Sequence, residues 1–210
     1  SMAKTAVTEV NPVVLKAINL KRVEIPIVGQ SELIVHRWSE KAKKQMLEKQ
    51  MKATRLKKEA KDPVADYEAS IYKLPDGRHG FPATGFKAAI VGACRMFEGL
   101  PMTVAKIAIR VIGEGPEQLV AIEGEPHMRE DMVRLENGVA DIRYRAGYWP
   151  WSAILKIVYN SNILTLESLV NLVNAAGMGG VGEWRPAAPK SATGTYGTFA
   201  VAGEVIDRDL

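Results

Sequence analysis

The chain has 210 residues, a net charge of +4, 47% hydrophobic residues and one cysteine. This length and apolar content suffice for one elaborated domain, or two small ones, with a real core. The single cysteine, Cys94, excludes an internal disulfide and a cysteine-rich zinc site. No apolar run is long enough to span a bilayer and no signal-peptide core is present, so we expect a cytoplasmic protein without membrane contacts.

The positive charge is concentrated in one segment, residues 39–61. This segment carries nine Lys and Arg side chains against three Glu, whereas the rest of the chain has a small excess of acids. Concentrated positive charge is typical of proteins that bind polyanions, although a solvated lysine-rich helix would give the same pattern. The candidate contacts to a polyanion in this segment are Lys41, Lys43, Lys44, Lys52 and Arg55.

The first half of the chain predicts one long strand, a polar helix, a hairpin and a core helix. Leu20 to Val28 alternates with period two, which predicts a half-buried strand with three inward residues, Val23, Ile25 and Ile27. Pro26 indicates either a sheet edge or the end of the strand. Residues 40–60 are good helix formers, and Asp62-Pro63 ends that helix. A hairpin is expected over 69–81, and a core helix over 83–97 capped by Thr84.

The second half predicts mostly strands. They are expected at 104–112, 118–122, 140–148, 151–159 and 196–205, with a charged, turn-rich stretch over 123–138 that ends in the tight-turn pair Asn137-Gly138. Arg143 and Arg145 share one face of their strand, which suits either phosphate contacts or pairs with acids on a neighbouring strand. Thr165 caps a helix that Gly177 ends.

These elements indicate an α+β fold. Without its insertions the order is strand, helix, strand, strand, helix, strand, which is the ferredoxin-like or RRM-like βαββαβ pattern. The expected organisation is an N-terminal arm (1–19), one RRM-like domain (20–205) and a polar tail (206–210). A basic helical insertion subdomain (29–82) follows the first strand, and the two core helices leave one sheet face open for a ligand.

A glycine-dense loop between the last helix and the last strand is the main candidate site. Glycines allow a backbone to approach a bulky anion closely, and their exposed N–H groups can form an anion-binding concavity. An indole and a guanidinium at the rim suit a base or a phosphate. A structural surface loop would show the same glycines. The candidate contacts are Gly179, Gly180, Gly182, Trp184, Arg185 and Lys190, joined by Lys87 and Arg95 of the core helix.

This loop and the element order resemble the RAMP superfamily, which includes the backbone subunit of CRISPR effector complexes. Gly80-Phe81-Pro82-Ala83-Thr84-Gly85-Phe86-Lys87 resembles the superfamily's turn before its first core helix, and the insertion resembles a thumb. The resemblance implies that the glycine loop and the adjacent sheet face contact an RNA backbone. A phage-encoded relative with a different nucleic-acid task would also fit.

The sequence therefore favours a non-catalytic protein that binds single-stranded RNA or DNA through its phosphates, forms homo-oligomers along the strand and needs no cofactor or metal. The motifs of common hydrolases and nucleotide-binding sites are absent. A metal-independent ribonuclease of the same fold is one alternative, for which His36, His79 or Asp141 could serve. A structural protein whose basic helix docks on an acidic protein partner is another.

Overall fold

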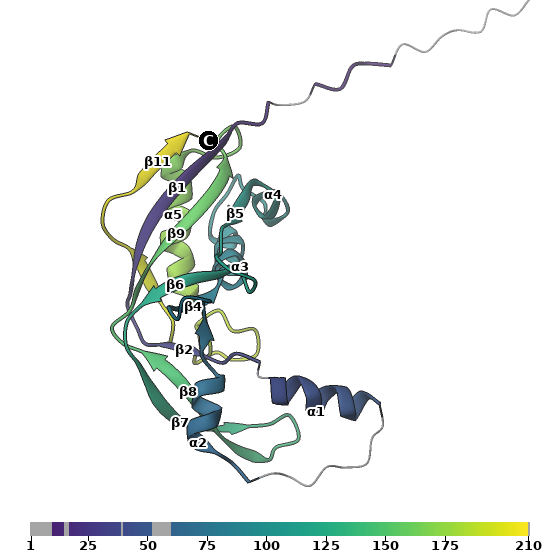
Figure 1. The fold of residues 1–210 in the computed structure, drawn as a ribbon. Coiled ribbons are helices and arrows are strands. Elements are labelled where there is room, and N and C mark those ends of the chain that lie inside the picture. Colours follow the sequence, from purple (N-terminus) through teal and green to yellow (C-terminus); the bar gives the residue numbers. More distant parts are fainter. Residues whose placement is uncertain (1–9, 15–16, 39, 52–59, 210) are drawn as a thin grey trace, which may run out of the picture.

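The computed structural model describes residues 10–14, 17–38, 40–51 and 60–209, which form an α+β fold (Figure 1). Most of the strands belong to one antiparallel sheet, and three others form a second, smaller sheet. Within the described residues no helix is long and apolar enough to cross a membrane.

The larger sheet is built around β1 (Leu20–Gly29) and β9 (Ser152–Asn160), which pair along nearly their whole length. The sheet order is β10-β1-β9-β6-β4-β3, with β11 also on β1 and β5 also on β9. The other strands are β3 (Tyr72–Lys73), β4 (His79–Pro82), β5 (Ile109–Val111), β6 (Leu119–Glu123), β10 (Phe199–Val201) and β11 (Ile206–Asp209).

The predicted inward face of β1 is confirmed. Val23, Ile25 and Ile27 are at most 2% exposed and face the core together with alternate residues of β9. Pro26 lies in the interior of the sheet, where the outer ladder is interrupted: β11 pairs with residues 21–24 and β10 with residues 27–29. Because no strand of the described residues pairs with Pro26 on that side, its missing N–H costs no ladder hydrogen bond there.

The smaller sheet has the order β2-β8-β7 and was only partly predicted. Its strands are β2 (Leu33–Val35), β7 (Pro126–Arg134) and β8 (Ala140–Tyr148). Strand β7 falls where a turn-rich stretch was expected, because its charged side chains give no apolar alternation. The Asn137-Gly138 turn between β7 and β8 is confirmed, and the N–H of Leu135 donates to the carbonyl of Val139 at 2.9 Å.

The helices are α1 (Glu40–Gln50), α2 (Pro63–Ala69), α3 (Ala83–Ala93), α4 (Met102–Ala108) and α5 (Leu166–Gly179), with a 3₁₀ turn, η1 (Cys94–Met96), after α3. Helices α3, α4 and α5 pack on the larger sheet, whereas α2 packs on β8 of the smaller one. α3 and α5 pack against each other, α3 also against β5, and α5 against β10. α1 has no buried residue and projects beside the β7–β8 hairpin (Figure 1).

Three local expectations were wrong. The first part of the strand expected at 104–112 is α4, whose Ile107 is 83% exposed, so its apolar side chain was no sign of a buried face. The cap of α3 is Pro82 rather than Thr84, and no side chain caps this helix. Helix α5 continues past Gly177 to Gly179, because the left-handed residue that ends it is Gly180, with φ +73°.

The C-terminal segment and the segment after β1 are both integrated into the sheets. Residues expected as a tail form β11, which pairs with β1 from Lys21 to Glu24. The strand expected at 196–205 is shorter, spanning Phe199–Val201. The segment 29–82, expected as an inserted subdomain, contributes β2 to the smaller sheet and β3 and β4 to the larger one.

Candidate nucleic-acid interface

The glycine loop folds closely back on the core. Gly180, Gly182 and Gly197 have φ between +70° and +81°, a region that side chains disfavour. A Cβ at Gly182 would lie 2.5 Å from the carbonyl oxygen of Ile34, and one at Gly197 would collide with the carbonyl oxygen of Val181. These glycines are therefore required for the packing of the loop itself, whatever the loop binds.

Trp184 lies on the inner side of this loop rather than at an open rim. Its indole ring stacks over the guanidinium of Arg145 at 4.7 Å and lies 5.9 Å from the ring of Tyr196. Its backbone has φ +55°, which is unusual for a residue with a side chain. Trp184, which was expected to contact a ligand, is therefore half-buried and covers a charged cluster.

This cluster joins the β7–β8 hairpin to the loop. Arg145 is fully buried and donates from Nη2 to Asp131 at 3.0 Å. Arg129 binds both oxygens of Asp131, at 3.0 and 3.1 Å, and also donates to Glu32. The ring of Tyr196 lies 5.0 Å from the Arg129 guanidinium. Charge-assisted pairs of this kind are strong when both partners are held in place.

The electrostatics of the cluster follow from its two guanidinium groups. Burial alone would raise the pKa of Asp131, but hydrogen bonds from Arg129 and Arg145 outweigh burial and hold that pKa below its ordinary value. The carboxylate is therefore charged at neutral pH. Arg145 thus pairs with an acid of the neighbouring strand, which is one of the two roles expected for it.

A groove of about 680 Å³ lies between α3 and the glycine loop. We call it the glycine groove. Its walls include small residues of α3, the end of α5 and the start of the loop. Five of the predicted contacts line it: Arg95, Gly179, Gly180, Gly182 and Arg185. The guanidinium of Arg185 donates to the carbonyl of Gly182 at 3.0 Å, which fixes this cation at the rim.

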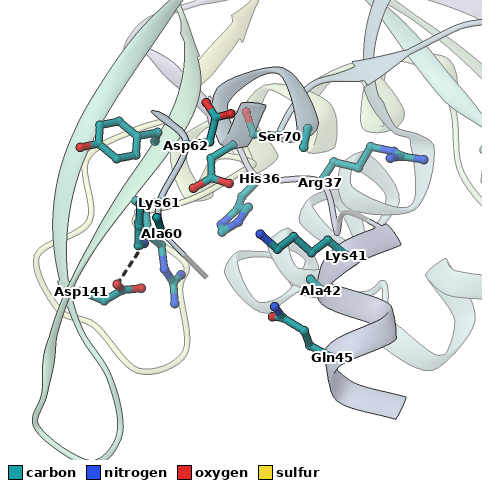
Figure 2. A pocket seen from close by; sticks show the side chains of 14 residues that line it. His36, Arg37, Lys41, Ala42, Gln45, Ala60, Lys61, Asp62, Ser70 and Asp141 are labelled. Carbon is teal, nitrogen blue, oxygen red and sulfur yellow. Dashed lines mark ion pairs between the residues drawn. The ribbon is translucent and has the colours of Figure 1, made fainter. Parts of the chain in front are cut away.

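A second cavity, of about 330 Å³, opens between α1, α2 and the β7–β8 hairpin (Figure 2). We call it the α1 pocket. Lys41 reaches toward it from α1, and Lys61 and Asp141 lie on the opposite side, where they form an ion pair at 3.0 Å (Figure 2). Arg143 of β8 also lines this pocket. His36 lines both cavities, so the two adjoin at this residue.

Some cations along these cavities are engaged and others are not. Arg37 forms an ion pair with Glu117 at 2.9 Å. Neither Arg95 nor Arg143 forms an ion pair with another described residue. The acids of the α1 pocket are partly engaged, since Asp62 caps α2 and Asp141 pairs with Lys61. Arg95 and Arg143 therefore add positive charge to the two cavities, although Arg143 lies close enough to Asp141 to help lower the pKa of that carboxyl.

The remaining predicted contacts lie away from the cavities. Lys43 pairs with Glu40 on exposed α1, and Lys44 is exposed on the same helix. Lys87 is half-buried on α3 and lines neither cavity. Lys190 is 88% exposed and pairs with Glu136 of the β7–β8 turn. Lys52 and Arg55 lie outside the described residues.

Of the candidate catalytic residues, His36 and Asp141 both line the α1 pocket, whereas His79 lines neither cavity. His79 shares a 2.8 Å hydrogen bond with the hydroxyl of Tyr148, and Asp141 is paired with Lys61. The His36 side chain makes no hydrogen bond to another residue that the structure describes, and burial lowers the pKa of its imidazole below the ordinary value. In the described part of the chain, no cluster of His, Cys, Asp and Glu side chains could hold a metal ion.

Neither cavity uses the open face of the larger sheet. No residue of β1 or β9 lines the glycine groove or the α1 pocket. The face opposite the helices carries Ile154, which is 54% exposed. The sequence did not reveal the α1 pocket, because its residues come from three separated segments of the chain, 36–45, 60–70 and 141–144.

The sequence matches no family model and no curated protein. The fold resembles a chain in the cryo-EM structure of the type III-B Cmr-beta bound to cognate target RNA, with a TM-score of 0.52 and 9% identity. The match covers 91% of this chain but 61% of the other, so the protein spans about three fifths of that chain's length. The crystal structure of Cmr6 from Pyrococcus furiosus is also similar, with a TM-score of 0.39, 12% identity and coverage of 89% and 100%.

Proposed function

We propose that this protein binds single-stranded RNA or DNA through its phosphate backbone, without catalysis, along the glycine groove and the α1 pocket. The observation that carries the proposal is that the two cavities meet at His36 and are bordered by Lys41, Arg95, Arg143 and Arg185. Cations spaced along a continuous path suit a ligand whose negative charges are also spaced along a path.

The fold similarity supports this function. The Cmr-beta structure, by its description, is bound to cognate target RNA. We interpret β1, α3, β5, β9, α5 and β10 as a βαββαβ core, a finer interpretation than the α+β class. The antiparallel neighbours β10-β1-β9, with β5 on β9, agree with it. On this interpretation the protein is a RAMP-like subunit of the CRISPR-like type.

His36 and Asp141 both line the α1 pocket, but no hydrogen bond between the two side chains is present in the described residues, and we propose a non-catalytic role on this ground. His79 and Asp141 are each bonded to a structural partner. Incubation with labelled RNA tests this proposal: product formation that is lost in His36→Ala or His79→Ala would replace it with a ribonuclease function. If the protein instead docks on an acidic protein, it will purify without nucleic acid and show no raised ratio of absorbance at 260 nm to that at 280 nm.

The proposal predicts that affinity for oligouridylate or oligothymidylate falls steeply with salt. Each phosphate contact on a single strand contributes about 0.7 to the slope of log K against log salt concentration. The double substitution Lys41→Gln with Arg185→Gln should therefore lower the slope by about 1.4. Fluorescence anisotropy over a salt series measures this change.

The matched control is Lys106→Gln with Lys156→Gln. These substitutions remove the same charge from residues that line neither cavity. An equal loss of slope in both double variants would show that only net charge matters. Binding that is absent, or unaffected by salt, would contradict the proposed function itself.

A further inference from the structure

Arg145 is a buried cation with unused hydrogen-bonding capacity. Its side chain is fully buried, and one nitrogen, Nη2, donates to Asp131. Its Nε and Nη1 have no hydrogen-bond partner among the described residues. Buried polar groups in native proteins are normally paired, because an unpaired buried donor is destabilising. Because the Arg145 guanidinium is held in place and keeps unpaired donors, it can bind a further anionic ligand.

Glu183 lies between these donors and the glycine groove. Its Oε2 is 3.9 Å from Nη1 of Arg145, which is within ion-pair range but too far for a hydrogen bond. The Glu183 side chain is 41% exposed, and the residue lines the groove. Its carboxylate therefore has one side toward the solvent of the groove and the other toward the buried guanidinium.

The backbones on both sides of this contact are fixed. The N–H of Glu183 donates to the carbonyl of Ile34 at 3.0 Å, and the N–H of Tyr196 donates to the carbonyl of Trp184 at 3.0 Å. Arg145 is held by Asp131 and by the indole of Trp184. The Glu183 side chain is thus the part of this contact that can move without unfolding the loop.

We propose that Arg145 forms a phosphate subsite beneath the glycine groove and that the Glu183 carboxylate covers it until a strand binds. This inference rests on the proposed function and adds a site to it. A phosphodiester of the bound strand takes the place of the carboxylate and accepts hydrogen bonds from Arg145. Both groups carry one negative charge, so the exchange leaves the charge of the cluster unchanged, and guanidinium binds phosphate oxygens well.

Two substitutions at Glu183 test the subsite. Glu183→Gln removes the negative charge that faces Arg145 and keeps the size of the side chain. Affinity for a fluorescein-labelled strand of about 20 nucleotides should then rise about fivefold. Glu183→Asp keeps the charge at the rim but shortens the side chain by one methylene, so its carboxylate reaches Arg145 less well. We expect this variant to bind about threefold more tightly than the parent protein. Anisotropy titrations with oligouridylate and oligothymidylate measure both changes.

Glu136→Gln is the matched control, because Glu136 is 94% exposed and its substitution changes the net charge equally. It should alter affinity by less than about twofold, since exposed charges are screened. The gain from Glu183→Gln should disappear when Arg145→Lys is added, provided that urea unfolding shows a folded protein.

Two results would overturn the subsite while leaving the proposed function intact. One is a Glu183→Gln variant that binds no more tightly than Glu136→Gln. The other is a Glu183→Asp variant that binds like the parent protein, because the loss of negative charge at the rim would then account for the whole gain in affinity of Glu183→Gln. If the parent protein and all variants fail to bind either oligonucleotide, the proposed function is wrong as well.

Discussion

At the scale of single residues, the buried charges of the β7–β8 hairpin connect it to the glycine loop. Arg145 and Arg129 are directly opposite each other in the β7–β8 register, and Asp131 accepts hydrogen bonds from both. Two cations at adjacent positions would repel each other without this shared carboxylate. Trp184 covers the Arg145 guanidinium from the loop side. The cluster therefore holds together two segments that are distant in the sequence.

Asp131→Asn should lower the free energy of unfolding by about 3 kcal/mol at neutral pH, the lower value for breaking a buried ion pair. The pKa of Asp131 is lower in the folded than in the unfolded chain, so its contribution is present above the ordinary pKa and is lost as pH falls through the folded pKa. The difference between parent and variant should be largest above about pH 5 and shrink below about pH 4. Urea unfolding at several pH values measures it.

Asp76→Asn serves as the comparison. Asp76 pairs with Arg78 on the surface, and both side chains are about half exposed. Water screens such a pair, so this variant should change stability far less. A difference between parent and Asp131→Asn that stays constant from pH 7 to pH 3 would show that the carboxylate charge is not what stabilises the cluster.

At the scale of elements, α3 forms one wall of the glycine groove and leaves space there for a larger side chain. Gly92 lines the groove, and a Cβ added there would meet no atom within 4 Å. Most glycines of the loop offer no such room, since a Cβ at Gly182 would press against Ile34. The groove can therefore be filled from the helix without disturbing the loop.

Gly92→Leu should raise helix stability by about 0.5 to 1 kcal/mol, because glycine is a poor helix former. The same change should weaken oligonucleotide binding at least about fivefold, which corresponds to ~1 kcal/mol, the lower value for one stacked base. Thermal unfolding and anisotropy titration together measure the two effects.

Thr84→Leu, at an exposed position of α3 that lines neither cavity, is the control. Unchanged binding by Gly92→Leu would mean that the ligand avoids the groove.

At the scale of the whole molecule, the surface divides into a cavity side and an opposite sheet face. The glycine groove and the α1 pocket adjoin at His36, and neither is lined by β1 or β9. A path of this length accommodates only a short stretch of a strand. We therefore propose that several copies bind side by side on a longer strand, as homo-oligomers.

This assembly should appear in the mass of the complexes. With an oligonucleotide of about 10 nucleotides we expect one copy per strand, and with about 60 nucleotides several copies, because one OB-fold-sized module covers roughly 4 to 16 nucleotides. Size-exclusion chromatography with light scattering measures the mass. A single copy on strands of both lengths would contradict assembly along the strand, although binding itself would stand.

The sequence by itself determined the elements whose pattern reflects burial on one face. The alternation of β1 and β9 and the apolar stripe of α5 follow directly from contact with the core, so Val23, Leu155 and Leu169 could be assigned in advance. The αL turn at Asn137-Gly138 follows from backbone sterics alone, and Gly138 has φ +81°. The clustering of positive charge in residues 39–61 is also a property of the sequence.

Only the tertiary structure decided where polar residues lie. Strand β7 has charged residues that pair with β8 and the loop, and no local pattern reveals such partners. Ile107 is apolar yet exposed on α4, and Arg145 is charged yet fully buried beneath Trp184. Local sequence reports the average preference of a side chain for water. The burial of a charge depends instead on partners from distant segments, which only the folded chain brings together.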